Sequence, residues 1–170
     1  LGLQAVHRRP DVAGQAGLLS TAGDLTRYAR MLLSGGTLDG VKVLSPAAVA
    51  QMTAAHDVPG GIRALGWDMQ SNYSMHRGTR LSRRAFGLGG NTGTALWIDP
   101  KQDLFVIVLS NRVNADGRGS VDRLTREIAN AASALLEPPA AVASTGVNPT
   151  VAPGAALAPG ISKVATPVVR

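Results

Sequence analysis

The stretch Phe86–Pro100, FGLGGNTGTALWIDP, decides the fold of this chain. Its first half is rich in glycine, which lets a backbone approach a ligand or a neighbouring strand closely. Its second half, residues 94–98, consists of β-branched, aromatic and apolar residues that suit a sheet. A polar turn over residues 99–103 leads into a second apolar run, residues 104–109. The pattern predicts an antiparallel hairpin that is buried on at least one face.

The glycines of this stretch do not form a dinucleotide-binding loop. Such a loop needs a strand before the glycines and a helix after them, whereas a strand pattern follows them here. Two interpretations stay open. The glycines either mark a strand edge that serves packing alone, or a strand edge that lines an active site.

Composition indicates one globular domain with an aliphatic core. The chain has 170 residues, of which 45% are hydrophobic and only 4% aromatic. Its net charge of +6 permits contact with nucleic acid. However, the basic residues are spread along the chain, and the one cluster, Arg77 to Arg84, lacks the aromatic residues that stack on bases. We therefore expect a solvated loop there and no nucleic-acid partner.

Several classes of site are disfavoured by what the sequence lacks. It has no cysteine, which excludes disulfides and thiol catalysis. His7, His56 and His76 stand in predicted loops without carboxylate or cysteine partners at ligand spacing, so we expect no metal and no cofactor. No apolar run approaches the roughly 20 residues of a membrane span. The chain begins with Leu1 and shows no signal peptide, so we expect its true N-terminus upstream.

Three helices are expected around the hairpin. Thr21 is a good N-cap for a helix that ends at Gly35-Gly36, and Ser45-Pro46 begins a second helix that runs to about Thr53. Ser120 caps a third helix that ends near residue 135 and packs across the hairpin. One apolar stripe is expected to bury this third helix, and it consists of Val121, Leu124, Ile128, Ala131 and Leu135.

The remaining segments are expected to be less regular. Residues 54–64 are interpreted as a loop and residues 70–84 as a loop or irregular hairpin, with a strand over 65–69 between them. Residues 137–170 hold six prolines and no hydrophobic period, which predicts a disordered tail or linker. The fold class is therefore α+β, an antiparallel sheet flanked by helices, with a domain over residues 1–136 followed by this tail.

Four segments in order carry a resemblance to a known family. They are Gly17–Leu25, Met31–Gly36, Leu44–Pro46 and Phe86–Pro100. Together they resemble the serine β-lactamase-like family, which includes penicillin-binding proteins, DD-peptidases and family-eight esterases. The resemblance runs from about residue 12 to 135 and implies a partial β-lactamase/transpeptidase-like domain. It also implies an active site between the sheet and the helices, and a periplasmic or secreted location.

The family performs acyl transfer with three motifs, of which two are missing here. No serine is followed by lysine three residues later, and neither Tyr28 nor Tyr73 begins a Tyr-x-Asn element. The sequence thus resembles the C-terminal part of an acyl hydrolase for an ester, peptide or β-lactam substrate. No catalytic residue is expected in this chain, which would be inactive without a partner, the missing N-terminal portion of the domain.

The third motif is present in altered form and defines the candidate substrate-binding strand. Leu88-Gly89-Gly90 aligns with the family's Lys/His-Thr/Gly-Gly, so Leu88 stands where a cationic or imidazole group is expected. The resemblance implies that the Asn91 N–H contributes to an oxyanion hole. The turn residues Thr92 and Gly93 complete the strand's substrate-binding edge. The alternative is a non-catalytic module that binds a ligand or peptide on a degenerate scaffold.

Overall fold

The computed structural model describes residues 18–90, 92–111 and 121–136 of the chain. The chain divides into two units, residues 1–138 and 139–170, and all described residues belong to the first. The elements in chain order are α2 (Ala22–Leu33), β1 (Thr37–Leu38), β2 (Val41–Lys42), α3 (Pro46–Met52), β3 (His56–Val58), β4 (Gly61–Arg63), β5 (Asp68–Ser71), the 3-10 helix η1 (Ser74–His76), β6 (Phe86–Gly89), β7 (Ala95–Asp99), β8 (Leu104–Val108) and α4 (Val121–Ala134).

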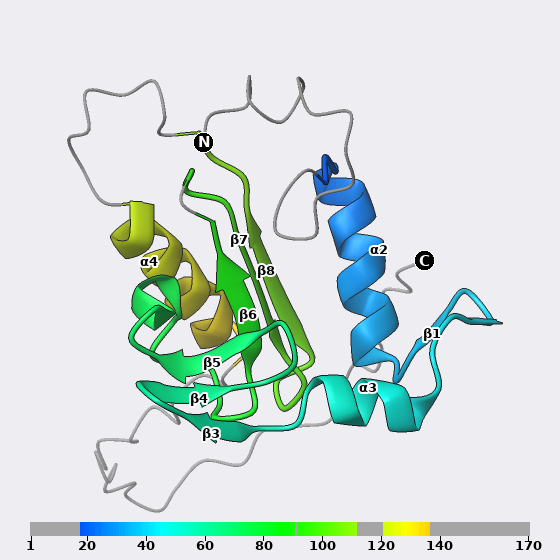
Figure 1. Ribbon diagram of the computed structural model, residues 1–170. Helices are drawn as coiled ribbons and strands as arrows, with labels where there is room; N and C mark the ends of the chain where they lie inside the picture. The colour runs from blue at the N-terminus through cyan, green and yellow to red at the C-terminus, as the bar shows by residue number, and fades with distance from the viewer. Residues whose placement is uncertain (1–17, 91, 112–120, 137–170) are drawn as a thin grey trace, which may run out of the picture. The chain divides into compact units, whose positions relative to one another are not determined.

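Six strands form one antiparallel sheet in the order β3-β4-β5-β6-β7-β8, and β1 and β2 form a separate two-stranded ribbon. Figure 1 shows α2 and α4 on opposite sides of the strands β6 to β8. The fold is therefore α+β, with helices on both faces of an antiparallel sheet, as the sequence predicts.

The predicted hairpin is confirmed as β7 and β8. The two strands pair from Ala95↔Val108 to Asp99↔Leu104, within a residue of the expected bounds. Trp97 and Ile98 join different hydrophobic clusters, so they point to opposite faces as expected. On the other side of β7 the glycine-rich segment forms a strand of its own, β6, which pairs from Phe86↔Ile98 to Gly89↔Ala95.

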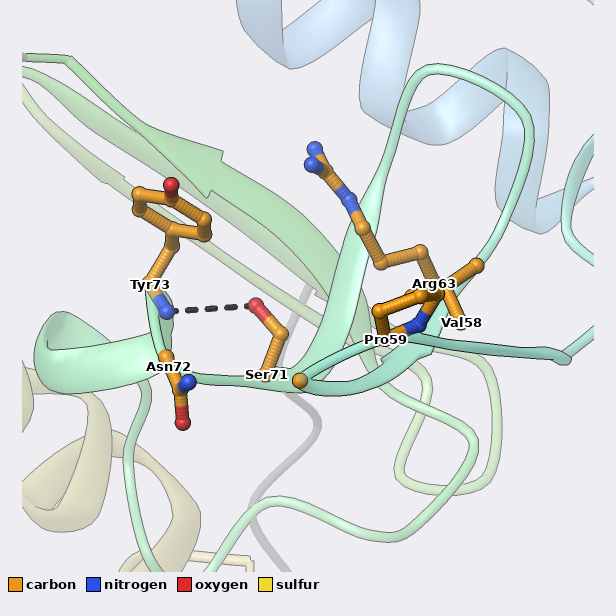
Figure 2. Close-up of a pocket in the computed structure, with 7 residues that line it drawn as sticks. Val58, Pro59, Arg63, Ser71, Asn72 and Tyr73 are labelled. Atoms are coloured by element: carbon orange, nitrogen blue, oxygen red, sulfur yellow. Dashed lines mark hydrogen bonds between the residues drawn. The ribbon is translucent and has the colours of Figure 1, made fainter.

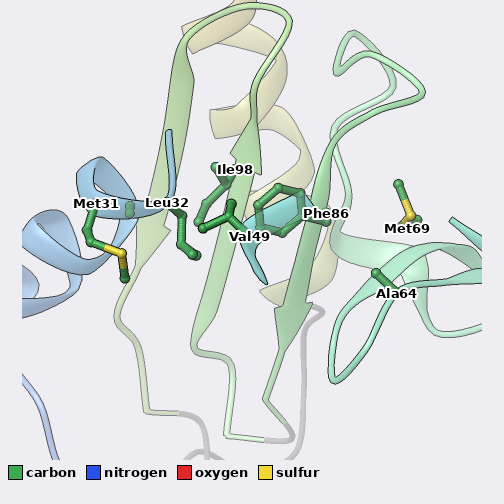
Figure 3. Close-up of a cluster of buried hydrophobic side chains, with 8 residues drawn as sticks. Met31, Leu32, Val49, Ala64, Met69, Phe86 and Ile98 are labelled. Atoms are coloured by element: carbon green, nitrogen blue, oxygen red, sulfur yellow. The ribbon is translucent and has the colours of Figure 1, made fainter. Parts of the chain in front are cut away.

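Helix α2 covers one face of the sheet. Its N-terminus is fixed by Thr21, whose hydroxyl oxygen accepts a hydrogen bond from the Asp24 N–H at 3.1 Å. Its buried residues, Ala29, Met31 and Leu32, contribute to a core that spans the helix, α3 and the sheet. Figure 3 shows Val49 of α3, Phe86 of β6 and Ile98 of β7 meeting in this core.

Helix α4 covers the other face, but it does not bury the stripe that the sequence predicts. The residues that it buries are Thr125, Ala129 and Ser133. Leu124, Ile128 and Leu135 are 51%, 39% and 86% exposed. The prediction was wrong because it ranked side chains by polarity, whereas small side chains let the helix axis come close to its neighbours.

Close packing explains why small residues were preferred on the buried face of α4. An added Cβ on Gly78 would lie 2.8 Å from the Ala129 Cβ, so the backbone of residue 78 rests directly against the helix. The buried hydroxyl of Ser133 donates a hydrogen bond to Gln102 Oε1 at 2.6 Å, so it is not left without a partner in the interior. The predicted helix itself is confirmed, since α4 packs against β8.

The loop predicted over 54–64 is instead a short hairpin, β3 and β4. The strands pair from His56↔Arg63 to Val58↔Gly61 around Pro59-Gly60. Gly60 has φ +91°, the backbone that a Pro-Gly turn requires. His56 consequently lies in a strand and not in a loop. These three-residue strands escaped the sequence analysis because their hydrogen bonds are backbone bonds and their side chains follow no apolar alternation.

Two further boundaries differ from expectation. The strand predicted over 65–69 begins three residues later, as β5, because Ala64 and Trp67 exchange backbone hydrogen bonds in a tight turn. The loop predicted over 70–84 contains the end of β5 and η1, which places His76 in a 3-10 helix. The expected tail and His7 lie outside the described residues. None of the described helices combines the length and apolarity that crossing a membrane requires.

Candidate functional site

The predicted substrate-binding residues lie at the end of β6 and in the turn that leads to β7. Leu88 is 44% exposed, Gly89 is partly buried, and Gly90 is exposed. The turn is closed by a hydrogen bond from the Gly93 N–H to the Gly90 carbonyl at 2.9 Å. Asn91, the expected oxyanion donor, lies outside the described residues.

The register of β6 and β7 determines where the N–H and C=O of Gly89 point. The Gly90 N–H donates to the Thr94 carbonyl at 2.6 Å, and this bond belongs to a hydrogen-bonded pair of the antiparallel ladder. Because such pairs alternate with non-hydrogen-bonded pairs, Gly89↔Ala95 is a non-hydrogen-bonded pair. The N–H and C=O of Gly89 therefore point towards the β5 side of β6.

On that side the edge of β6 is open at Gly89. Strand β5 pairs with β6 at Asp68↔Gly87 only. Within the described part of the chain, no residue continues the ladder past Gly87. The Gly89 donor and acceptor are thus presented to any extended segment that binds beside β6. Gly90 is not equivalent, since Thr94 already accepts its N–H.

The turn is held in place by the segment that follows β8 and by the start of α4. The Ser110 hydroxyl donates to the Gly93 carbonyl at 2.7 Å. A Cβ on Gly93, whose φ is +96°, would lie 2.4 Å from Ser110 Oγ and 3.1 Å from Val121 Cγ1. Glycine is therefore required here both by the backbone conformation and by the close approach of α4.

Sequence reasoning missed His76, which covers Gly89 from the α4 face. An added Cβ on Gly89 would lie only 1.4 Å from His76 Nε2, so the imidazole fills the space that a side chain would take. The ring packs edge-on against Trp97 with centroids 5.9 Å apart. No spacing in the sequence signals this contact, because η1 brings His76 back onto β6 from a point 13 positions earlier.

Buried polar groups position η1 and therefore His76. The fully buried Asp68 accepts a hydrogen bond from the Ser74 hydroxyl at 2.7 Å. The next residue after η1, Arg77, donates to the carbonyls of Leu81 and Ser82. Burial lowers the pKa of the Arg77 guanidinium below its usual value, while the carboxylates of Asp99 and Asp68 oppose this shift.

The site contains no recognisable metal-binding set. Within the residues that the structure describes, no three His, Cys, Asp or Glu side chains gather closely enough to hold an ion. The arrangement offers backbone hydrogen-bonding groups, an exposed Leu88 and one nearby imidazole, and it is suited to holding an extended acyl chain.

Comparison with known proteins decides the family. A family profile described as Beta-lactamase matches residues 2–131. This chain belongs to the beta-lactamase family. It is a hydrolase-superfamily chain whose fold and sequence both fit a serine beta-lactamase/penicillin-binding-protein fragment.

The relatives of this beta-lactamase-family chain include two bacterial proteins named putative D-alanyl-D-alanine carboxypeptidase. The one from Salmonella enteritidis PT4 is 34% identical over 103 residues, which are 59% of this chain and 24% of the relative. The one from Escherichia coli O157:H7 is 33% identical over 113 residues, which are 64% of this chain and 25% of the relative. The chain thus spans about a quarter of the length of these relatives.

Among solved structures, a beta-lactamase from Mycobacterium bovis resembles this chain. It is 27% identical, with a TM-score of 0.50, and the match covers 69% of this chain and 44% of that one. The incomplete coverage of the longer proteins agrees with the interpretation that this chain contains part of a beta-lactamase-family domain.

A groove lies elsewhere on this beta-lactamase-family sheet, between the β3–β4 turn and the end of β5. Its volume is about 400 Å³, and it is lined by Val58, Pro59, Gly60, Arg63, Ser71, Asn72 and Tyr73. Figure 2 shows the Tyr73 ring and the Arg63 guanidinium extending to the same side, with the Ser71 hydroxyl between them. Strand β5 runs antiparallel to β6, so Ser71 lies beyond Asp68↔Gly87 in the direction away from Gly89.

Proposed function

We propose that this chain is the C-terminal part of a serine acyl hydrolase that acts on an ester, peptide or β-lactam substrate. The observation that carries the proposal is the open edge of β6 at Gly89, in a chain of the beta-lactamase family. An extended acyl substrate beside β6 would accept a hydrogen bond from the Gly89 N–H and donate one to its C=O. Backbone groups of this kind also stabilise the negative charge that develops on a carbonyl under attack.

In this proposal the nucleophile comes from the part of the family domain that this chain does not contain. The printed sequence has no Ser-x-x-Lys, and a serine without a positioned base is a weak nucleophile. The isolated chain would then hold an acyl group beside β6 without attacking it. Its activity would depend on assembly with the N-terminal portion.

The exposed stripe of α4 supports such an assembly. Leu124, Ile128, Ala131 and Leu135 recur at the spacing of one helix face, and all four are exposed in the described structure. Exposure of four neighbouring aliphatic side chains to water is unfavourable, and such a surface can pack against the apolar face of another amphipathic helix. In this proposal that helix belongs to the N-terminal portion of the domain.

A second function is favoured by Leu88. The residue stands at the third-motif position where the family carries a cation or imidazole, and its side chain is aliphatic and 44% exposed. A site of this kind would bind a ligand or peptide along β6 without turning it over. The two functions differ in covalent chemistry, so one experiment separates them.

The test is acylation in the absence and presence of the N-terminal portion. We expect no adduct when the chain alone is incubated with a fluorescent penicillin or p-nitrophenyl acetate and analysed by intact-mass spectrometry. We expect an adduct and ester hydrolysis when the polypeptide encoded directly upstream of Leu1 is added. With that portion present, Leu88→His should raise the rate by about 10- to 1,000-fold, the scale of one acid–base or electrostatic group.

The outcomes distinguish the two functions. A stoichiometric adduct on a serine of the chain alone would contradict the proposed dependence on another portion. Assembly of the two portions without any adduct or hydrolysis would support the non-catalytic binding module instead. The matched control is Leu65→His, which adds an imidazole at a position that is 60% exposed and outside β6.

A further inference from the structure

The groove between Arg63 and Tyr73 has features that packing alone does not explain. Arg63 lies at the edge of the groove, and within the described residues its guanidinium has no ion pair and no hydrogen bond. Its N–H donors are therefore available to an anion from outside the chain, and a guanidinium pairs with a carboxylate through two parallel hydrogen bonds. None of the seven residues that line the groove is acidic.

The donors in the groove are held in fixed positions by the backbone. The Ser71 N–H donates to Ser74 Oγ at 2.8 Å, and the Ser71 hydroxyl oxygen accepts from the Tyr73 N–H at 3.2 Å. That leaves the hydroxyl proton of Ser71 without an acceptor among the described residues. The Asn72 N–H donates to the Gly60 carbonyl at 3.2 Å, which joins the end of β5 to the β3–β4 turn.

The opposite wall of the groove is apolar. Tyr73 exposes 70% of its surface, an unusual extent for a large aromatic residue. In Figure 2 its ring and the Arg63 guanidinium flank the Ser71 hydroxyl, while Val58 and Pro59 lie beside Arg63. The groove of about 400 Å³ is within the size range of small-molecule sites.

We propose that this groove binds a small carboxylate ligand that also carries an aromatic or apolar group. The planar guanidinium of Arg63 holds both carboxylate oxygens, and the Ser71 hydroxyl donates to one of them. The apolar group of the ligand lies against the Tyr73 ring. The site is separate from the Gly89 edge and does not depend on the proposed acyl chemistry.

The test uses three probes that differ by one feature each. The first is N-acetyl-L-phenylalanine. The second is N-acetyl-L-phenylalaninamide, which lacks the carboxylate, and the third is N-acetylglycine, which lacks the aromatic ring. Each is titrated into the full chain labelled with nitrogen-15. We expect saturable shifts of the Ser71 and Tyr73 amide resonances with N-acetyl-L-phenylalanine. The amide should bind at least about tenfold more weakly, since it forfeits the charge-assisted pair, and N-acetylglycine should bind several-fold more weakly.

Variants keep the proposal falsifiable. Arg63→Gln should weaken binding by about tenfold or more, Arg63→Lys by less, and Tyr73→Leu by a few-fold, while the exposed Arg83→Gln should leave binding unchanged. Unchanged thermal midpoints exclude unfolding as the cause. Equal binding of the acid and its amide, no effect of Arg63→Gln, or no saturation at 20 mM would overturn the proposal.

Discussion

The carboxylate of Asp99 accepts hydrogen bonds from both the backbone N–H and the hydroxyl of Ser82, each at 2.6 Å. Asp99 is fully buried at the end of β7, and it accepts a third bond from the Lys101 N–H at 3.0 Å. One side chain therefore fixes the loop that precedes β6 to the turn that follows β7. This loop also contains Arg77, so the contact stabilises the segment that leads from η1 to β6.

Asp99→Ala should destabilise the chain by about 3 kcal/mol, because it removes a fully buried carboxylate and leaves three partly buried donors unpaired. Ser82→Ala removes one donor and should cost about 1–2 kcal/mol. Urea unfolding measures both changes, and Ser20→Ala, at an exposed position, is the control. An effect of Asp99→Ala no larger than that of Ser20→Ala would contradict the role assigned to this carboxylate.

Gly89→Ala should be more disruptive than its size suggests. The new methyl would lie 1.4 Å from His76 Nε2, so the imidazole must leave its place against Trp97. We expect a loss of about 1–3 kcal/mol, the range for overpacked cores. In a His76→Ala background the same substitution should cost much less, because the space is then empty.

Gly23→Ala is the matched control for that cycle. Its added Cβ would lie 3.7 Å from Thr21 Oγ1, an ordinary contact, and the position lies within α2. The substitution should stabilise the chain by up to about 1 kcal/mol through helix propensity. Additive effects of Gly89→Ala and His76→Ala would show that the two residues do not compete for the same space.

Tyr28 should make stability fall at high pH. Burial raises the pKa of its phenol above 10.0, and the ring stacks on Trp67 with centroids 6.2 Å apart. Above pH 10 the unfolded chain loses the Tyr28 proton before the folded chain does, so the free energy of unfolding decreases until the pH passes the folded pKa. Below pH 9 this contribution is constant.

Tyr28→Phe isolates the effect. The variant removes the phenol and keeps the ring, so its free energy of unfolding should decrease less steeply between pH 9.5 and 11 than that of the unaltered chain. Urea denaturation at each pH provides the comparison, and lysine titration cancels between the two proteins. Parallel curves for the two proteins would contradict the assigned shift.

The elements that were predicted correctly are those in which a local sequence pattern, such as an apolar run or an N-cap residue, agrees with the tertiary environment. Residues 104–109 are wholly apolar, and β8 (Leu104–Val108) contributes side chains to the hydrophobic clusters on both faces of the sheet. Thr21 and Ser45 cap helices because each hydroxyl oxygen accepts an N–H three residues later. The β3–β4 hairpin was missed because its pairing depends on backbone bonds and a Pro-Gly turn, which leave no hydrophobic period.

The close packing around the glycine-rich strand was predicted for a similar reason, and its role as a substrate-binding edge stays a prediction. The glycines between Gly87 and Gly93 signalled a close approach, and the structure assigns specific neighbours to them: Trp97 at Gly87, His76 at Gly89, and Ser110 and Val121 at Gly93. The identity of such neighbours depends on where η1 returns to the sheet, which local sequence does not encode. Among the described residues of β6, Gly89 is the one that presents its backbone N–H and C=O at the open edge, which depends on the strand register and not on composition.

The exposed stripe of α4 yields the last prediction. Polar substitution of Leu124 or Ile128 to Gln should change the free energy of unfolding of this chain by less than about 0.5 kcal/mol, since both side chains already contact water. Ala129→Leu should cost about 1–3 kcal/mol, because Ala129 is fully buried against Gly78. The hydrophobic substitution is thus expected to be the damaging one.

The substitutions on the stripe, which hardly affect the stability of the chain alone, should weaken its assembly with the N-terminal portion. The polypeptide encoded directly upstream of Leu1 should raise the thermal midpoint of the unaltered chain, since binding to the folded state stabilises it by mass action. Leu124→Gln and Ile128→Gln should reduce that rise, because each places an amide against the apolar face of the added helix. Arg126→Gln, an exposed change off the stripe, should leave the rise intact. If Ile128→Gln destabilises the chain alone as much as Ala129→Leu does, the stripe is an interior surface and not a docking surface.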